Sequence, residues 1–353
     1  MEYHLKPSRI QEKVNTPFII PVFIPHQGCP HRCIFCDQRR ISGRDRRQPI
    51  TPREVRAIIH LWLARSRKNR ERAVQVAFYG GSFTGLSRPR QQELLAAAAP
   101  FLERGEVHSL RLSTRPDYID AGIVAFLKDY GVSVVELGVQ SLDDQVLAAG
   151  NRGHGAQQTR DAIRLLRRSG LQVGAQLMIG LPAETTRSLM KTVREMAGLQ
   201  PNFVRIYPVL VLQGSGLARL YEQGEYRPLS LGAAVIRAAW MKKYFAAYSI
   251  PVVRLGLQPG PALESALLAG PYHPAFGELV NSRLMLQRTR RLLAGVEAGC
   301  RVTLTIADRD QSVFRGLKSA NISRLEQLGL LKKFTLCLDP SQPRQTVTLT
   351  PGS

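Results

Sequence analysis

The sequence has no long apolar run and few acidic residues, and both shortages limit what the protein can be. No apolar stretch reaches the roughly 18 residues that a helix needs to cross a bilayer. The N-terminal segment MEYHLKPSRIQEK has no apolar stretch of the secretory type. We therefore expect a cytoplasmic protein without a membrane partner. Hydrophobic residues make up 44% of the 353 residues, which is enough for one domain of about 250 residues and a small appendage.

Cysteine is also scarce, with five residues in the chain. Three of them, Cys29, Cys33 and Cys36, lie within eight residues, whereas Cys300 and Cys337 stand far downstream. An odd and clustered set argues against a disulfide framework. We expect reduced thiols.

The balance of charge is strongly basic. Lys and Arg total 49 against 27 Asp and Glu, so the formal net charge is +22. Such a field attracts polyanions, and RNA or DNA is the obvious candidate. A basic composition that serves only solubility is the alternative. Basic residues crowd between residues 32 and 72 and again between 283 and 333, and they form one face only if the fold joins these regions.

Short β-rich runs alternate with helical patterns along most of the chain. We expect strands over 18–24, 74–80, 108–114, 133–139, 171–180 and 202–212, and helices over 52–66, 90–103, 121–131, 156–170, 185–198 and 231–249. The strands are almost continuously apolar, which is typical of a parallel sheet covered by helices. This pattern predicts an α/β fold, open or curled into a partial (β/α)6 barrel, with its chemistry at the C-terminal strand ends.

The alternation of strands and helices ends after the sixth strand–helix pair. Residues 270–283, GPYHPAFGELVNSR, contain the prolines and glycines of a junction. A strand over 300–307, a helix over 319–329 and strands over 332–338 and 345–350 then predict a small α+β domain. We therefore expect a loose tail at 1–18, the barrel and junction at 19–280, and a small basic α+β domain at 281–353.

The small domain contains one motif of interest for RNA binding. In VFRGLKSANISRL, the residues Gly316, Ser319 and Ile322 precede or begin a helix. The arrangement is similar to the backbone-clamping loop of KH RNA-binding modules, with serine in place of the second glycine. An ordinary capped helix explains the same residues.

The three clustered cysteines form a C-x₃-C-x₂-C run in GCPHRCIFC. A four-iron cluster is usually held by four thiolates, so three thiols leave one iron open to a small-molecule ligand. Structural zinc takes four protein ligands, and only His26 and His31 lie nearby to complete them. Structural cysteines without metal are the remaining alternative.

This run, with Phe35 just before its last cysteine and its place after the first strand, resembles the radical S-adenosylmethionine (SAM) superfamily. The resemblance implies a [4Fe–4S] cluster on Cys29, Cys33 and Cys36 that binds SAM at its open iron. It also implies reductive cleavage of SAM to a 5′-deoxyadenosyl radical, and hence a low-potential electron donor such as flavodoxin or ferredoxin.

Two strand-end motifs fit the same resemblance. In YGGSF, Gly80, Gly81 and Ser82 match the glycine motif that meets the methionine amino group of SAM. In ELGVQS and NRGH, the resemblance places Gln140 at the ribose of SAM and Arg152 at its carboxylate. Arginine suits a carboxylate because its planar fork donates two hydrogen bonds.

Three further residues complete the predicted site. Gln176, in QLMIGLP, falls in the segment that lines the ribose and adenine in the family. Ser113, in STRPDYI, lies near the end of the third expected strand. Tyr207 ends the sixth and could line the substrate cavity or relay hydrogen, although simple packing is the usual role of such a tyrosine.

The strings STRPDYI, ELGVQS, NRGH and RIYPVLVLQGSGL resemble the radical SAM domain of the Elongator catalytic subunit, over about residues 19–258. The resemblance implies modification of wobble uridine in tRNA. Ser113 stands where that subunit has Glu, and too little chain follows for an acetyltransferase domain. We therefore expect tRNA or another RNA as substrate, with a separate acetyltransferase as a possible partner.

Two other functions stay open. One is a tetrapyrrole enzyme that resembles the oxygen-independent coproporphyrinogen oxidases, because GVQS, NR and GLP also occur there. The other is a non-catalytic RNA-binding protein with a structural iron–sulfur cluster. Cleavage of SAM and salt-sensitive binding of tRNA would separate these functions.

Overall fold

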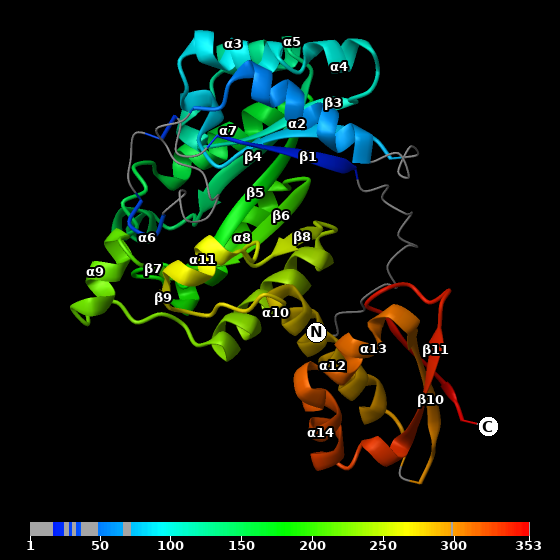
Figure 1. Cartoon of the computed structure of the whole chain (residues 1–353). Coiled ribbons are helices and arrows are strands. Elements are labelled where there is room, and N and C mark those ends of the chain that lie inside the picture. Colours follow the sequence, from blue (N-terminus) through cyan, green and yellow to red (C-terminus); the bar gives the residue numbers. More distant parts are fainter. Residues whose placement is uncertain are drawn as a thin grey trace. The chain divides into compact units, whose positions relative to one another are not determined.

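The computed structural model describes residues 17–24, 28–29, 33–36, 49–65, 72–297 and 299–352. Its main sheet has seven strands in the order β1-β2-β3-β4-β5-β6-β8 (Figure 1). The pairs β1–β2, β2–β3, β3–β4 and β6–β8 are parallel. The sheet and its helices confirm the predicted α/β class and partial barrel with a C-terminal α+β part. None of the described helices is both long and apolar enough to span a membrane.

The strands are β1 (Phe18–Phe23), β2 (Val74–Tyr79), β3 (Ser109–Thr114), β4 (Val132–Gln140), β5 (Gln172–Ile179), β6 (Phe203–Pro208), β7 (Val211–Leu212), β8 (Val252–Leu255), β9 (Leu267–Ala269), β10 (Val302–Ala307), β11 (Phe334–Asp339) and β12 (Val347–Pro351). The helices are α2 (Pro52–Arg65), α3 (Arg88–Ala96), α4 (Ala99–Glu103), α5 (Ala121–Asp129), α6 (Asp144–Ala149), α7 (Ala156–Arg168), α8 (Thr186–Leu199), α9 (Gly216–Glu222), α10 (Leu231–Ala247), α11 (Pro261–Ala266), α12 (Phe276–Ala294), α13 (Gln311–Arg315) and α14 (Ala320–Gln327). Short 3₁₀ turns are η2 (Phe83–Gly85), η3 (Pro116–Tyr118), η4 (Asp308–Asp310), η5 (Leu317–Ser319) and η6 (Leu331–Lys333).

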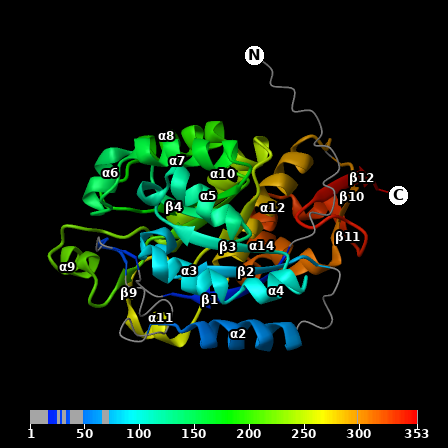
Figure 2. The ribbon, with the colours of Figure 1, turned by 90° about the horizontal axis from the view of Figure 1, so that it is seen from above.

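The chain divides into two compact units. The first comprises the described parts of 1–31, 38–138 and 157–174. In it, α2 runs beside β1 (Figure 2). The middle of β2 is fully buried at Val76, Ala77 and Phe78, as expected for a covered parallel sheet. The expected helix over 90–103 forms as α3 and α4, because Pro100 has no amide hydrogen to continue α3 and instead lies in the first turn of α4.

The second unit comprises 32–37, 139–156 and the described part of 175–353. Its C-terminal sheet has the order β11-β10-β12, with β10 parallel to β11 and antiparallel to β12. Helices α12, α13 and α14 pack with it, in orange and red in Figure 1. Helix α12 begins within the expected junction and contributes Met285 and Leu293 to the core of this sheet. Residue 281, the expected domain boundary, therefore lies inside a helix, and the division into domains stays a prediction.

Candidate active site

The segment that bears Cys29 lies against the turn after β2, within the first unit. Gly28 has a φ of +73°, and a Cβ on it would lie 2.0 Å from the carbonyl oxygen of Ser82. A Cβ on Gly85 would lie 2.1 Å from the carbonyl oxygen of Gly28. Two glycines therefore allow direct backbone contact between the Cys29 segment and the YGGSF turn.

The predicted glycine motif is built into a buried hydroxyl network. Gly80 has a φ of +90°, and Gly81 and Ser82 follow it in the turn. The Ser82 hydroxyl lies 3.0 Å from the Thr114 hydroxyl and accepts the backbone N–H of Arg115 at 3.2 Å. Thr114, at the end of β3, thus fixes the serine of the motif. Its role was not predicted, although the string STRPD contains it.

The end of β3 also shapes the surroundings of Cys29. Arg115 is buried and donates two hydrogen bonds to Asp117, at 2.9 and 2.8 Å. Burial raises the pKa of the Tyr118 phenol; the charges of Asp117 and Cys29 also raise it, whereas that of Arg115 lowers it. Ser113 directs its hydroxyl to the carbonyl oxygen of Phe78 at 3.4 Å. The proposed contact of Ser113 with the cofactor stays a prediction.

A second polar network lies between β2, β3 and β4. Arg111 forms a buried ion pair with Glu136, and Tyr79 donates its hydroxyl hydrogen to Glu136 at 2.7 Å. Arg111 also donates to Gln75 at 3.0 Å. Sequence reasoning missed these residues, because alternation inside a mostly apolar strand does not show which polar residues meet.

In the second unit, Cys33 and Cys36 lie at the two ends of one tight turn. The backbone N–H of Cys36 donates to the carbonyl oxygen of Cys33 at 3.0 Å. Arg152 donates a guanidinium N–H to the Cys33 sulfur at 3.3 Å, and both residues are buried. A charged donor is a suitable partner for a thiolate ligand. The structure thus brings together two predicted site residues that are 119 positions apart.

The same turn is anchored by its two middle residues. The Ile34 N–H donates to the carbonyl oxygen of Gly150 at 3.2 Å, and the Leu217 N–H donates to the carbonyl oxygen of Ile34 at 2.7 Å. Phe35 lies against Gly150, where a Cβ would come within 3.1 Å of its ring. The aromatic residue before the last cysteine therefore packs beside the NRGH motif.

Gln140 and Gln176 form another predicted pair that the structure joins. The Gln176 amide donates to the side-chain oxygen of Gln140 at 3.3 Å. Gln140 has a φ of +68°, a left-handed conformation that is costly for a residue with a side chain. Such a conformation persists when neighbouring contacts fix it.

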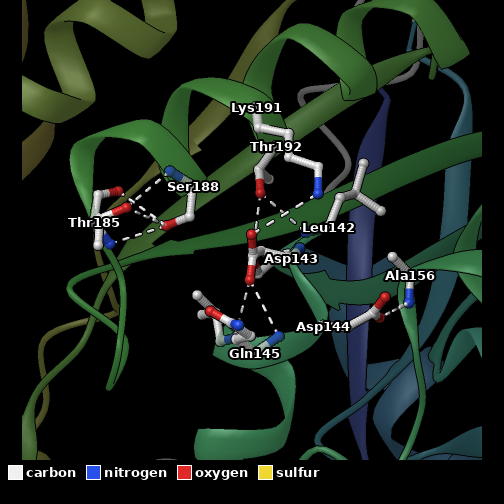
Figure 3. Close-up of polar contacts among 11 residues, drawn as sticks. Leu142, Asp143, Asp144, Gln145, Ala156, Thr185, Ser188, Lys191 and Thr192 are labelled. Carbon is white, nitrogen blue, oxygen red and sulfur yellow. Dashed lines mark hydrogen bonds and ion pairs between the residues drawn. The ribbon is translucent and has the colours of Figure 1, made fainter.

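The residues after Gln140 are held by α8 and by contacts within their own segment, shown in Figure 3. Thr192 accepts the backbone N–H of Leu142 at 3.0 Å, and its hydroxyl lies 3.2 Å from that of Ser141. Asp143 accepts two backbone N–H groups at the start of α6, and Asp144 accepts the N–H of Ala156 at 2.7 Å. The segment between Gln140 and Arg152 is thus held at both ends.

Tyr207 lies half-buried on β6. Among the described residues, no hydrogen bond or ring contact links its side chain to the other predicted site residues. Its assignment as a catalytic residue stays a prediction.

The donor set fits an iron–sulfur cluster. Three thiols are available, and a guanidinium faces one of them. Cys29 belongs to the first unit, and Cys33 and Cys36 to the second. Within the described part of the chain, no three His, Cys, Asp or Glu side chains already form a metal-binding group. His26 and His31, which a zinc site would need, lie outside the described residues.

Comparison with known proteins adds independent findings. The model of the radical SAM superfamily matches residues 23–196, and that of the radical SAM C-terminal domain matches residues 201–285. An uncharacterised protein of Methanocaldococcus jannaschii is 32% identical over 223 residues, which cover 60% of this chain and 67% of that protein. A tRNA uridine(34) acetyltransferase of the same organism is 37% identical over 123 residues, which cover 34% of this chain and 23% of the acetyltransferase.

Among solved structures, the archaeal Elp3 of Methanocaldococcus infernus matches with a TM-score of 0.57 and 22% identity. The match covers 76% of this chain and 63% of the Elp3 chain, and at this identity it shows the fold. The chain thus spans less than two thirds of these tRNA-related proteins. With both family models matched between residues 23 and 285, the chain belongs to the radical SAM superfamily of enzymes, whose cofactors are a [4Fe–4S] cluster and SAM.

Proposed function

We propose that this radical SAM enzyme modifies tRNA, with Cys29, Cys33 and Cys36 as the ligands of its [4Fe–4S] cluster. The main support for this ligand set is the 3.3 Å contact between Arg152 and the Cys33 sulfur, which joins the cysteine run to the NRGH motif. When bound, the cluster supplies the electron that cleaves SAM to a 5′-deoxyadenosyl radical. The chain's own residues position the two cofactors and the substrate.

Arg152 has two roles in this proposal. It would donate to the carboxylate of SAM as well as to the Cys33 sulfur, because a guanidinium has five N–H donors. Its planar guanidinium group would orient the carboxylate relative to the turn that holds Cys33 and Cys36. Gly80 and Gly81 would offer their exposed backbone to the amino group of SAM, because neither has a side chain in the way.

The two glutamines would receive the ribose. Gln140 and Gln176 are joined by one hydrogen bond, and each amide keeps further donors and acceptors for ribose hydroxyl groups. Phe35 would shield the cluster side from water, as it already packs on Gly150. Ser113 would contact the cofactor, and Tyr207 would act on the substrate.

RNA is the substrate class that the observations favour. The named relatives include tRNA uridine(34) acetyltransferases, and the net charge of +22 suits a polyanion. A flavodoxin or ferredoxin would deliver the electron. For the carboxymethylated type of wobble uridine, whose chemistry draws on acetyl-CoA, an acetyltransferase partner would supply that reactant.

The test starts from protein reconstituted with iron and sulfide without oxygen. Wild type given SAM and dithionite should form 5′-deoxyadenosine, and Cys33→Ala should form none. Cys337→Ala is the matched control, because that thiol is exposed on β11. Unchanged cleavage in Cys33→Ala would refute the assigned ligand.

The substrate is tested with the same protein and total tRNA, followed by mass spectrometry of the nucleosides. A SAM-dependent change at a wobble uridine is expected. Unmodified tRNA together with turnover of a porphyrinogen would overturn the RNA assignment and leave the cluster assignment intact.

A further inference from the structure

A basic groove lies in the second unit, and none of its lining residues is assigned to a cofactor. It has a volume of about 590 Å³ and is bordered by α10, α12 and the end of α14. Three exposed basic side chains line it, Lys243, Arg290 and Arg291. The other lining residues are neutral: Gln287, Ala294, Leu328 and Leu330. None of the described residues that line the groove is acidic.

The three basic side chains of the groove have no ion-pair partner among the described residues. None of the ion pairs between described residues includes Lys243, Arg290 or Arg291. Helix α12 contains four arginines and a single acidic residue, Glu278. Uncompensated like charges that gather on one surface attract a polyanion.

The pKa values of two nearby basic side chains, Arg288 and Lys242, are lowered in part by neighbouring positive charges. Burial lowers the pKa of Arg288, and the charge of Arg291 lowers it further. Burial lowers the pKa of Lys242 to about 8; the charge of Arg288 also lowers it, whereas that of Asp310 raises it. The positive groups along α10 and α12 are therefore close enough to oppose one another, and a bound anion would reduce that repulsion.

An aromatic ladder runs along α10, the helix that also contributes Lys243 to the groove. The rings of Trp240 and Tyr244 are 5.6 Å apart, and those of Tyr244 and Tyr248 are 5.2 Å apart and stacked. Tyr248 is 45% exposed. Trp240 and Lys243 are three residues apart and so are neighbours on the outer face of the helix. Helix α10 packs between α8 and α12 (Figure 2), so it carries both the ladder and one wall of the groove.

We propose that the α10–α12–α14 groove binds the phosphodiester backbone of the RNA substrate, with unpaired bases against the aromatic ladder. The inference rests on the proposed function and adds where the RNA is held outside the reaction site. Phosphates match the basic lining, and bases stack on aromatic rings whatever their sequence. An acidic protein segment would match the charge but would leave the ladder unused, so RNA fits more of the surface.

The test uses full-length, anaerobically reconstituted protein and fluorescently labelled unmodified tRNA. Binding is measured by anisotropy between low and physiological salt for wild type and for the triple variant Lys243→Gln, Arg290→Gln, Arg291→Gln. Affinity should fall about 10- to 100-fold, and the slope of log affinity against log salt should become shallower by about 2 to 3. Formation of 5′-deoxyadenosine without RNA should be unchanged, because none of these side chains is assigned to a cofactor.

The matched control removes three exposed arginines from another helix, α2: Arg53→Gln, Arg56→Gln and Arg65→Gln. It should weaken tRNA binding much less than the groove variant does. A second variant, Trp240→Ala with Tyr248→Ala, should weaken binding and leave the salt slope unchanged.

The outcomes separate this inference from the proposed function. If wild type modifies tRNA and the groove variant binds it with unchanged affinity and slope, the groove assignment fails and the proposed function stands. An equal loss in the α2 variant also overturns the groove, because net charge alone then explains binding. If wild type neither binds nor modifies tRNA, both proposals fail.

Discussion

Gly28→Ala should displace the segment that bears Cys29, because the backbone of Gly28 contacts the YGGSF turn. The added methyl carbon would lie 2.0 Å from the carbonyl oxygen of Ser82 and 2.9 Å from backbone atoms of Gly85 and Leu86. Real Cβ contacts are essentially never shorter than 3.0 Å, so the backbone must shift by about 1 Å, from 2.0 to 3.0 Å. None of the three neighbours is a side chain that could rotate away.

The expected loss in the free energy of unfolding has two parts. A φ of +73° costs alanine about 1 to 2 kcal/mol relative to glycine. The steric overlap adds about 1 to 3 kcal/mol, as for other forced insertions into a packed interior. Gly105→Ala separates these parts, because Gly105 has a φ of +69° and no heavy atom within 4 Å of its added Cβ.

The assay compares denaturant unfolding of the two variants and the iron bound per chain after anaerobic reconstitution. Gly105→Ala should lose about 1 to 2 kcal/mol and bind iron as wild type does. Gly28→Ala should lose a further 1 to 3 kcal/mol or so and bind clearly less iron, because Cys29 moves with its neighbour. Equal stability and equal iron in the two variants would refute the packing argument.

Two other predictions follow from single residues. Glu184 is 4% exposed and paired with Arg237, and burial raises its pKa to about 7 from 4.5. The native state therefore keeps a proton that the unfolded chain releases, so the unfolding free energy of wild type relative to Glu184→Gln should fall by up to about 3 kcal/mol between pH 4.5 and 7. A difference that stays flat in denaturant titrations across this range contradicts the burial argument. Thr192→Val removes the acceptor for Leu142 and should cost about 1 to 3 kcal/mol and weaken SAM binding, measured by calorimetry, whereas Thr186→Val on the exposed start of α8 should do neither.

Local pattern was enough to predict most of the main sheet. Its strands are apolar runs separated by amphipathic helices, and the spacing of apolar residues within each run can be seen in a short stretch of sequence. Strand β8 was missed because Val252–Leu255 is only four residues long and is followed by Gly256. Pro271 and Pro274 favour a junction at residues 270–283, but α12 begins there at Phe276, because prolines just before a helix do not prevent its formation.

The site was less predictable because its contacts join distant residues. Cysteine spacing pointed to the cluster, but nothing in the spacing pairs Cys33 with Arg152. Likewise, no local pattern shows that Gly28 touches Ser82 or that Thr192 fixes the loop after Gln140. These contacts arise when strand ends meet along one edge of the sheet, which depends on the whole topology.

The central claim is that three cysteines hold a cluster with one iron left for SAM. The most direct measurement is electron paramagnetic resonance of the anaerobically reconstituted, dithionite-reduced protein before and after addition of SAM. We predict a [4Fe–4S]⁺ signal that changes on addition of SAM and is lost in Cys33→Ala. A cluster signal that SAM leaves unchanged, or that persists in Cys33→Ala, would contradict the account.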